Sequence, residues 1–177
     1  MTEQIKKIEF VHINIVSYHQ DAIDLNRIEY NSFGNDYVKC GFCEKTGGYW
    51  VYHVDHIFDP VRGYYEKDAA AILHANGYKV ILESERNKGR NQKYSDGTLN
   101  NCVFEIQSVD GDGKNNIKGH FNNCFKKKVS IVVLYYPKPE LFDSDKLQKG
   151  YKKYIRLPRS IPLKVIYIVN GSVFKYK

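Results

Sequence analysis

An almost unbroken apolar run late in the chain constrains the fold more than any other stretch. Residues 129–136 read Val-Ser-Ile-Val-Val-Leu-Tyr-Tyr, and Pro137 and Pro139 follow at once. Consecutive β-branched and apolar side chains are typical of a strand that is buried on both faces of a sheet. Such a strand needs cover on both sides. The run therefore predicts an α/β protein with helices packed against its sheet.

The segments around this run alternate between helix and strand patterns. The Ala-rich stretch 68–74 favours a helix, Asn76-Gly77 ends it, and Asn170-Gly171 is a hairpin signal. The patterns predict helices over 64–75, 115–128 and 144–154, and strands over 78–82, 102–107, 129–136, 163–169 and 172–176. This order predicts that residues 61–177 form an α/β core in which a mixed central β-sheet is flanked by helices.

The first 60 residues are expected to form a β-rich N-terminal extension that packs on this core. Alternation over 5–16 predicts a strand, and a short helix is expected over 18–30. Residues 37–42 and 49–54 have the pattern of a hairpin, joined through Gly47 and Gly48.

Length, charge and cysteine content narrow the class of protein. A chain of 177 residues can form one compact domain. Its net charge of +7, from 27 Lys and Arg against 20 Asp and Glu, favours polyanionic partners such as nucleic acid. Four cysteines are too few for a disulfide framework. No run approaches the roughly 20 apolar residues of a membrane span, and the start has no signal-peptide stretch. We expect a soluble, intracellular protein or excised domain with no membrane partner.

Acidic side chains from separate predicted elements are the strongest candidates for chemistry. Asp96 lies at a turn or strand start, and Glu105 and Gln107 share one face of the following strand. Glu66 lies on the preceding helix. Carboxylates that converge provide the hard oxygen ligands that Mg²⁺ or Mn²⁺ prefers. Such a metal can polarise a phosphate and lower the pKa of a bound water. Glu66, Asp96 and Glu105 are therefore the predicted metal ligands, and Gln107 is predicted to orient the water or the phosphate.

Asp96, eight intervening residues and then Glu105-Ile106-Gln107 resemble the active-site signature of the PD-(D/E)xK nuclease superfamily. Glu66 matches the acidic residue that many members carry on the first core helix. Residues 63–136, under half of the chain, are more narrowly similar to the C-terminal tRNA-nuclease domains of contact-dependent inhibition toxins and to related phage and mobile-element nuclease-like domains. The shared layout consists of Tyr65-Glu66, Asn76-Gly77-Tyr78, Asp96-Gly97, Glu105-Ile106-Gln107, and Asn115-Asn116-Ile117 followed by Lys126 to Lys128.

The resemblance implies both a fold and an activity. It implies a restriction-endonuclease-like core and metal-dependent hydrolysis of phosphodiester bonds in RNA, with tRNA as the form that the resemblance favours and a DNA endonuclease as an alternative. Mg²⁺ or Mn²⁺ is the implied cofactor. If the protein is a toxin, a cognate immunity or inhibitor protein is expected, with the cytoplasm as the site of action and this chain as the delivered domain of a larger toxin system.

One departure from the signature opens a second hypothesis. Gln107 stands where the family usually has lysine, and its amide carries no charge to stabilise the transition-state phosphate. Lys118, or one of Lys126, Lys127 and Lys128, could supply that charge. The alternative is a catalytically inactive nuclease-fold module that binds nucleic acid or a protein partner. In a plainer interpretation, Asp96 is a turn residue and Glu105 a solvated strand residue.

A Cys₂His₂ pattern provides a separate candidate for Zn²⁺. Cys40-x2-Cys43 is followed after nine residues by His53-x2-His56. Thiolate and imidazole pairs in this order are zinc ligands, although the histidine spacing is shorter than usual. The two cysteines are equally typical of small buried residues. His56 alternatively belongs to the nuclease site, because it lies just before the Glu66 helix.

Basic runs and aromatic residues are candidates for nucleic-acid contact. Arg90 in the basic loop 86–93 and the four lysines named above could neutralise phosphates. Tyr151 and Tyr154, on a lysine-rich helix, are placed for stacking on unpaired bases. A solvated helix face is the alternative for any of these runs. His120 is a candidate general acid or base, or else a buried, hydrogen-bonded histidine.

Overall fold

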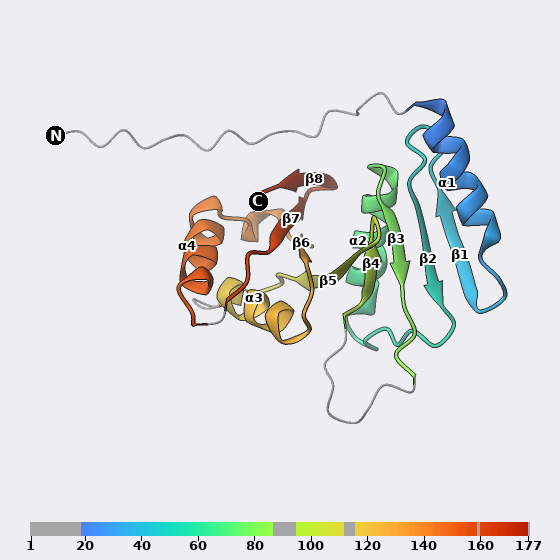
Figure 1. Ribbon diagram of the computed structural model, residues 1–177. Coiled ribbons are helices and arrows are strands. Elements are labelled where there is room, and N and C mark those ends of the chain that lie inside the picture. The colour runs from blue at the N-terminus through green and yellow to red at the C-terminus, as the bar shows by residue number, and fades with distance from the viewer. Residues whose placement is uncertain (1–18, 87–94, 112–115, 159, 177) are drawn as a thin grey trace.

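The computed structural model describes residues 19–86, 95–111, 116–158 and 160–176 (Figure 1). The strand predicted over 5–16 and Arg90 of the basic loop lie outside these residues. Within them, no helix combines the length and the apolar character needed to cross a membrane.

Helices and strands follow the predicted bounds closely. The N-terminal half contains α1 (Gln20–Ser32), β1 (Tyr37–Phe42), β2 (Tyr49–His53), α2 (Gly63–Ala75), β3 (Lys79–Leu82) and β4 (Gly97–Leu99). The C-terminal half contains β5 (Cys102–Ser108), α3 (Asn116–Lys126), β6 (Ile131–Tyr136), a 3₁₀ helix (Pro139–Leu141), α4 (Ser144–Ile155), β7 (Lys164–Val169) and β8 (Ser172–Lys175). The three-residue strand β4 is an addition to the elements predicted from the sequence.

The eight strands form one mixed sheet whose spatial order is the order of the chain. Pairing is antiparallel within β1–β2, β3–β4–β5 and β7–β8. It is parallel for β2–β3, β5–β6 and β6–β7. The apolar run that forms β6 lies between β5 and β7 and is buried almost throughout. The prediction of a mixed α/β sheet flanked by helices is confirmed.

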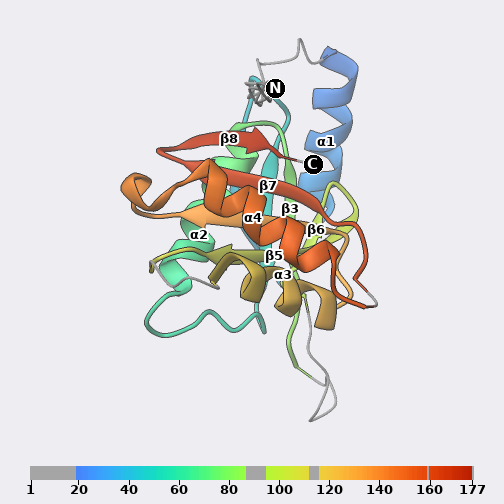
Figure 2. The same cartoon turned by 90° about the vertical axis from the view of Figure 1, so that its left-hand side faces the viewer.

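Successive residues of β6 enter two separate cores, which makes the molecule three-layered. Ile131 and Val133 pack with the α2 residues Ala69 and Leu73. Val132 alternates with them and joins the opposite core, which includes residues of α3 and α4. Figure 2 shows α3 and α4 in front of the strands on that second side.

The second core also contains the two tyrosines that were expected to stack on bases. Tyr151 and Tyr154 are only 9% and 1% exposed, and both rings pack against Phe121 of α3. They lie on the apolar face of α4, which is turned towards the sheet, whereas the lysines of α4 occupy the solvent face. The prediction of a stacking role for these tyrosines is therefore wrong.

The N-terminal segment continues the same sheet. Strand β2 pairs in parallel with β3, and β1 closes that edge. Helix α1 lies against this edge, where the ring centroid of Tyr30 is 5.6 Å from that of Phe42 and 5.7 Å from that of Tyr49. The helix and the hairpin predicted within the first 60 residues are both present, and from Gln20 onward this segment packs on the core.

A tight hairpin between β4 and β5 places the central acidic residues. Asn100 and Asn101 turn the chain with φ angles of 48° and 65°, a left-handed conformation that asparagine tolerates well. At Gly97, a Cβ atom would lie 1.9 Å from the carbonyl oxygen of Ile81, so only glycine fits beside β3. These constraints place Asp96, the residue before β4, beside the middle of β5.

Candidate functional site

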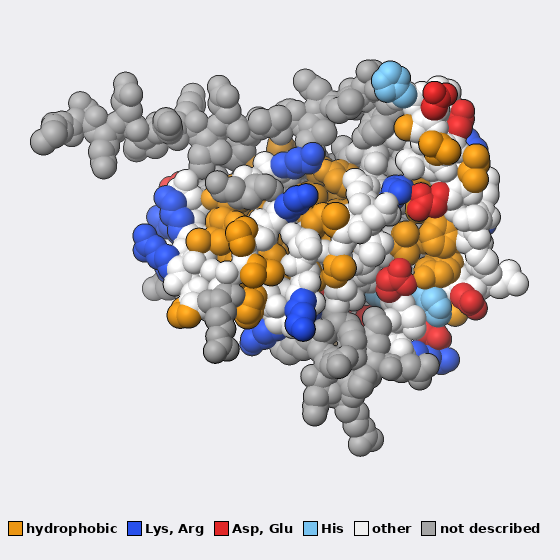
Figure 3. Space-filling view, in the orientation of Figure 1, with side chains coloured by type: hydrophobic (Ala, Val, Ile, Leu, Met, Phe, Trp, Pro, Cys, Tyr) orange, Lys and Arg blue, Asp and Glu red, His pale blue; other side chains and the backbone are white. Residues whose placement is uncertain are grey.

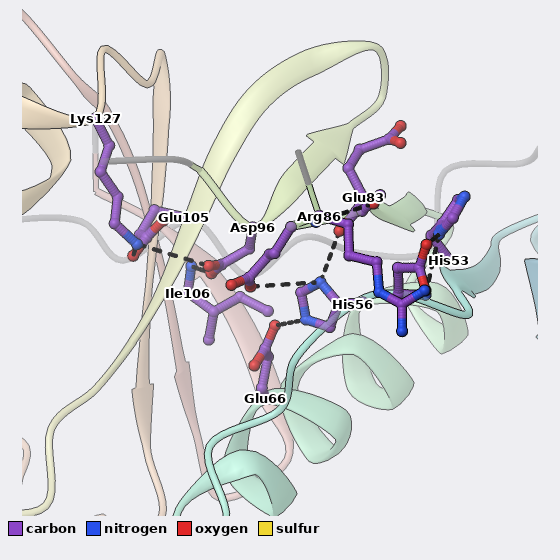
Figure 4. Close-up of polar contacts among 12 residues, drawn as sticks. His53, His56, Glu66, Glu83, Arg86, Asp96, Glu105, Ile106 and Lys127 are labelled. Carbon is purple, nitrogen blue, oxygen red and sulfur yellow. Dashed lines mark hydrogen bonds and ion pairs between the residues drawn. The ribbon is translucent and has the colours of Figure 1, made fainter. Parts of the chain in front are cut away.

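Asp96 and Glu105 come together across the β4–β5 hairpin. The Oδ2 atom of Asp96 accepts a hydrogen bond from the backbone N–H of Ile106, at 2.6 Å. The adjacent Glu105 side chain points to the α3 side of the sheet, where its residue is 2% exposed. Figure 4 shows the side chains of Asp96 and Glu105 close to that of Lys127. The two central carboxylates predicted from the sequence are therefore neighbours.

A cation from a different element lies beside both carboxylates. The ammonium group of Lys127, just after α3, donates a hydrogen bond to Glu105 Oε1 and lies 3.9 Å from Asp96 Oδ1 (Figure 4). Of the other lysines proposed to supply the missing charge, Lys126 and Lys128 are exposed to solvent. A positive charge is thus present at the site although Gln107 of β5 is neutral. Lys127, directly after α3, supplies it.

The surroundings of the two carboxylates oppose their ionisation. Burial raises the pKa of Asp96 well above its ordinary value, and the charges of Glu105 and Glu66 add to this effect. Burial likewise raises the pKa of Glu105, against the opposing influence of Lys127. The carboxylates in turn raise the pKa of Lys127, although its burial acts in the other direction. Acidic groups held in this state favour a further positive charge beside them.

Glu66 is held in place by a histidine. It projects from the first turn of α2, and its Oε1 atom is 2.7 Å from Nε2 of His56. The other ring nitrogen of His56 lies 2.9 Å from the carbonyl oxygen of Glu83. Burial lowers the pKa of His56, but the hydrogen bond and charge of Glu66 outweigh it, so the net shift is upward. His56 therefore contacts Glu66 of the candidate site. This is the position predicted from the sequence as the alternative to a zinc-binding role.

The four residues of the zinc hypothesis have other partners and do not converge. Cys40 Sγ is 3.7 Å from the carbonyl oxygen of Val38, and Cys43 Sγ is 3.8 Å from that of Ala75. His53 accepts a hydrogen bond from the N–H of Asp55. Across the described part of the chain, no three His, Cys, Asp or Glu side chains form a group that could hold a metal ion. This includes the three carboxylates, because Glu66 is turned to His56 and Lys127 contacts both Asp96 and Glu105.

A polar cavity of about 470 Å³ opens beside these groups. Its wall includes Glu66, Glu105, Gln107, His120 and Lys127. The Gln107 amide nitrogen donates to Glu105 Oε1 at 2.8 Å, and its oxygen is 2.8 Å from Nδ1 of His120. Asp96 adjoins this group but does not line the cavity.

Two residues that line this cavity each have a buried acceptor with no hydrogen-bond partner among the described residues; the two atoms are Glu105 Oε2 and His120 Nε2. An unpaired buried polar group costs about 1–3 kcal/mol, so each requires a donor or a cation. Mg²⁺ is commonly bound by one or two carboxylates, with waters and substrate phosphate completing its shell. Glu105, whose Oε2 atom is unpaired, and the neighbouring Asp96 fit such an ion. The metal prediction stays a prediction, with two carboxylates at its centre and Glu66 beside them.

Comparison with known proteins identifies no relative: no protein-family model, no curated protein and no solved structure matches this chain. The case for a function therefore rests on the residues and their geometry.

The sequence names His120 and Lys127 as separate candidates but does not place them together with Asn123 at one site. His120, Asn123 and Lys127 all line the cavity. Their spacings of three and four residues place them on one face of a helix. Ile117, Phe121 and Cys124 form the buried face of the same helix. The sequence does contain this helical spacing of polar residues, and it distinguishes Lys127 from Lys126 and Lys128.

Proposed function

We propose that this protein is a metal-dependent nuclease of the PD-(D/E)xK kind, in which Lys127 replaces the lysine of the strand motif. The observation that carries the proposal is the position of Lys127, whose ammonium contacts both Asp96 and Glu105 at the wall of a polar cavity. A carboxylate pair can hold a divalent metal, and an adjacent lysine can stabilise the charge that develops on a phosphate during hydrolysis.

Each residue has a role in this proposal. Asp96 and Glu105 hold Mg²⁺ or Mn²⁺, which when bound polarises the phosphate and lowers the pKa of a coordinated water. Lys127 stabilises the negative charge that develops on the phosphate. His56 fixes the orientation of Glu66 at the cavity wall. We further propose that the continuous segment from α2 to β6, which carries Glu66, Asp96, Glu105 and Lys127, is a restriction-endonuclease-like core.

The charge distribution supports a nucleic-acid substrate. Figure 3 shows most Lys and Arg side chains over the half of the molecule that contains α4 and the C-terminal strands, whereas most acidic side chains on this face lie towards α1 and β1. The exposed basic residues of α4 and its C-terminal end are Lys146, Lys149, Lys152, Lys153 and Arg156. We propose RNA, with tRNA as the favoured form, ahead of DNA. As a toxin domain acting in the cytoplasm, the protein would require a cognate immunity protein.

One observation favours a second candidate, a nuclease-fold module that binds nucleic acid without cleaving it. Lys127 already forms an ion pair with Glu105 and lies close to Asp96, and the described residues contain no ready-made group of three metal ligands. A protein of this kind would bind RNA equally well with and without a divalent metal.

Cleavage assays distinguish the two. Wild-type protein is incubated with tRNA, single-stranded RNA and duplex DNA, with Mg²⁺, with Mn²⁺ and with chelator. We expect metal-dependent cleavage that falls on the order of 10²-fold or more in Asp96→Ala, Glu105→Ala and Lys127→Ala, because each removes a group that acts on the transition state. Lys45→Ala removes an exposed charge from the turn between β1 and β2, away from the site, and serves as the matched control.

The outcomes separate clearly. Cleavage that survives both Asp96→Ala and Glu105→Ala overturns the assignment of the site. Metal-independent RNA binding without cleavage on any substrate supports the binding module instead. One equivalent of Zn²⁺ that is lost in Cys40→Ser would support the zinc hypothesis.

A further inference from the structure

A chain of hydrogen bonds joins Lys127 to His120 and determines which atoms in it are donors. An ammonium group can only donate, so Glu105 Oε1, which contacts Lys127, is an acceptor. The Gln107 atom 2.8 Å from that same oxygen is therefore its amide nitrogen. This orientation turns the amide oxygen of Gln107 towards His120.

The amide oxygen fixes the tautomer of His120. It can only accept, and it lies 2.8 Å from Nδ1 of the ring, so Nδ1 carries the proton. A neutral imidazole has one N–H, which leaves a lone pair on Nε2. Burial lowers the pKa of His120 to about 4, with a smaller opposing influence from Asp110, so the ring is neutral at ordinary pH.

The Nε2 atom of His120 accepts no hydrogen bond from the described residues. It is buried and has no partner among the described residues, and His120 shares the cavity wall with Glu66, Glu105 and Lys127. A buried acceptor in this condition lacks a donor, and a water molecule that moves from the cavity to the ring would supply one. Glu105 Oε2, the second unpaired acceptor, belongs to the same site.

We propose that His120 is the proton acceptor for the attacking water and that Gln107 holds it in the accepting tautomer. This inference rests on the proposed nuclease function and assigns one further catalytic residue to it. The water oxygen forms a bond to phosphorus while its proton passes to Nε2. The bond from phosphorus to the leaving oxygen breaks, that oxygen takes a proton from solvent, and His120 returns its own proton to solvent. One water is consumed for each bond cleaved.

This role explains the residue at position 107. A lysine there could only donate, so it would require Nδ1 to accept and would place the proton on Nε2, where the water must be activated. Glutamine can donate to Glu105 and accept from His120 at once. A bound phosphodiester, being an anion, would raise the pKa of His120 towards the range in which a base is effective.

The test uses Gln107→Lys, which restores the residue of the family signature. Nitrogen-15 NMR of the histidine rings should show the Nδ1–H tautomer for His120 in the wild type and the Nε2–H tautomer in this variant. Cleavage should fall at least about 10-fold in Gln107→Lys. An equally or more active Gln107→Lys, or a wild-type His120 in the Nε2–H form, overturns the inference.

His120→Ala separates a catalytic role from a structural one. We expect kcat to fall on the order of 10²-fold with little change in KM, and added imidazole to restore part of the activity, because only the base is missing. His19→Ala, which removes an exposed histidine at the start of α1, is the control. If the wild type cleaves RNA and His120→Ala cleaves it equally well, this inference fails alone. If Asp96→Ala and Glu105→Ala also retain cleavage, the proposed function fails with it.

Discussion

Asp96 is a carboxyl group in surroundings that disfavour its ionised form. Its side chain is only 14% exposed, and Glu105 and Glu66 add repulsion that Lys127 only partly offsets. Active sites commonly retain such unfavourable groups because function requires them, at a cost in stability. The same residue should therefore affect stability and activity in opposite directions.

Replacing this carboxylate with its neutral isostere tests that relation. Asp96→Asn keeps an oxygen for the N–H of Ile106 and removes the buried ionisable group. We expect the free energy of unfolding at pH 7 to rise by about 1 kcal/mol, which for a chain of this size raises Tm by about 2–4 °C, while cleavage is lost. Thermal unfolding followed by circular dichroism measures the change. Asp36→Asn, at an exposed position, should change stability by less than about 0.5 kcal/mol. A lower Tm in Asp96→Asn would show that its attraction to Lys127 outweighs its burial.

At the scale of single residues, the sequence predicted neighbours along one strand better than neighbours across elements. Strand alternation correctly places Glu105 and Gln107 on one face, because the period of a strand is fixed by its geometry. Which of the four candidate lysines reaches Glu105 depends on how α3 crosses the sheet. That crossing is set by packing with α4, which no local pattern contains. The selection of Lys127 therefore required the structure.

Helix α3 is the element that connects the core to the candidate site. Its buried face packs on α4, its other face presents His120 to the cavity, and Lys127 lines the cavity directly after its last residue. The close approach of the two helices depends on Gly150 of α4, because a Cβ atom there would lie 2.6 Å from Cγ2 of Ile117. A substitution in α4 that moves α3 should therefore displace the residues of α3 that line the cavity.

A matched pair of glycine substitutions tests this coupling. Gly150→Ala forces the helices apart and should lower the free energy of unfolding by about 1–3 kcal/mol, and cleavage should fall because α3 carries His120 and Lys127. Gly119→Ala lies in α3 itself but meets nothing within 4 Å, so it should raise stability by about 0.5–1 kcal/mol. Urea unfolding measures both. Equal effects from the two substitutions would mean that α3 and α4 are not closely packed in solution.

Elements with a full hydrophobic period were predictable, and short or irregular ones were not. The pattern over 115–128 predicts α3 because apolar residues recur at helical spacing, and the run 129–136 predicts β6 because nearly every position is buried. Strand β4 has only three residues, too few to show alternation. It exists because Gly97 allows close pairing with β3, which is a tertiary contact.

For the whole molecule, the sequence predicted the layers and not the order of the sheet. The apolar run of β6 required helices on both faces, and both cores are present. The parallel pairing of β2 with β3, which makes the N-terminal segment part of the same sheet, follows from the return of the chain through α2. No residue pattern distinguishes that return from a separate β-rich unit.

The dependence of global stability on pH reports on the buried histidine proposed as the base. The pKa of His120 is about 4 in the folded protein and about 6.5 when the chain is unfolded. Between these values the unfolded state binds more protons, so stability falls as the pH is lowered. Each pH unit of that difference corresponds to about 1.4 kcal/mol, and full protonation of His120 should therefore cost about 3 kcal/mol.

His120→Gln isolates this contribution from that of the carboxylates, which titrate in both proteins. The free energy of unfolding of each is measured by urea denaturation from pH 7.5 down to pH 4. The wild type should lose about 3 kcal/mol more than the variant, most of it between pH 6.5 and pH 4. Parallel profiles would mean that His120 is solvated and titrates normally. The Nε2 lone pair would then be shared with bulk water, and the cavity would lose the acceptor on which its proposed chemistry depends.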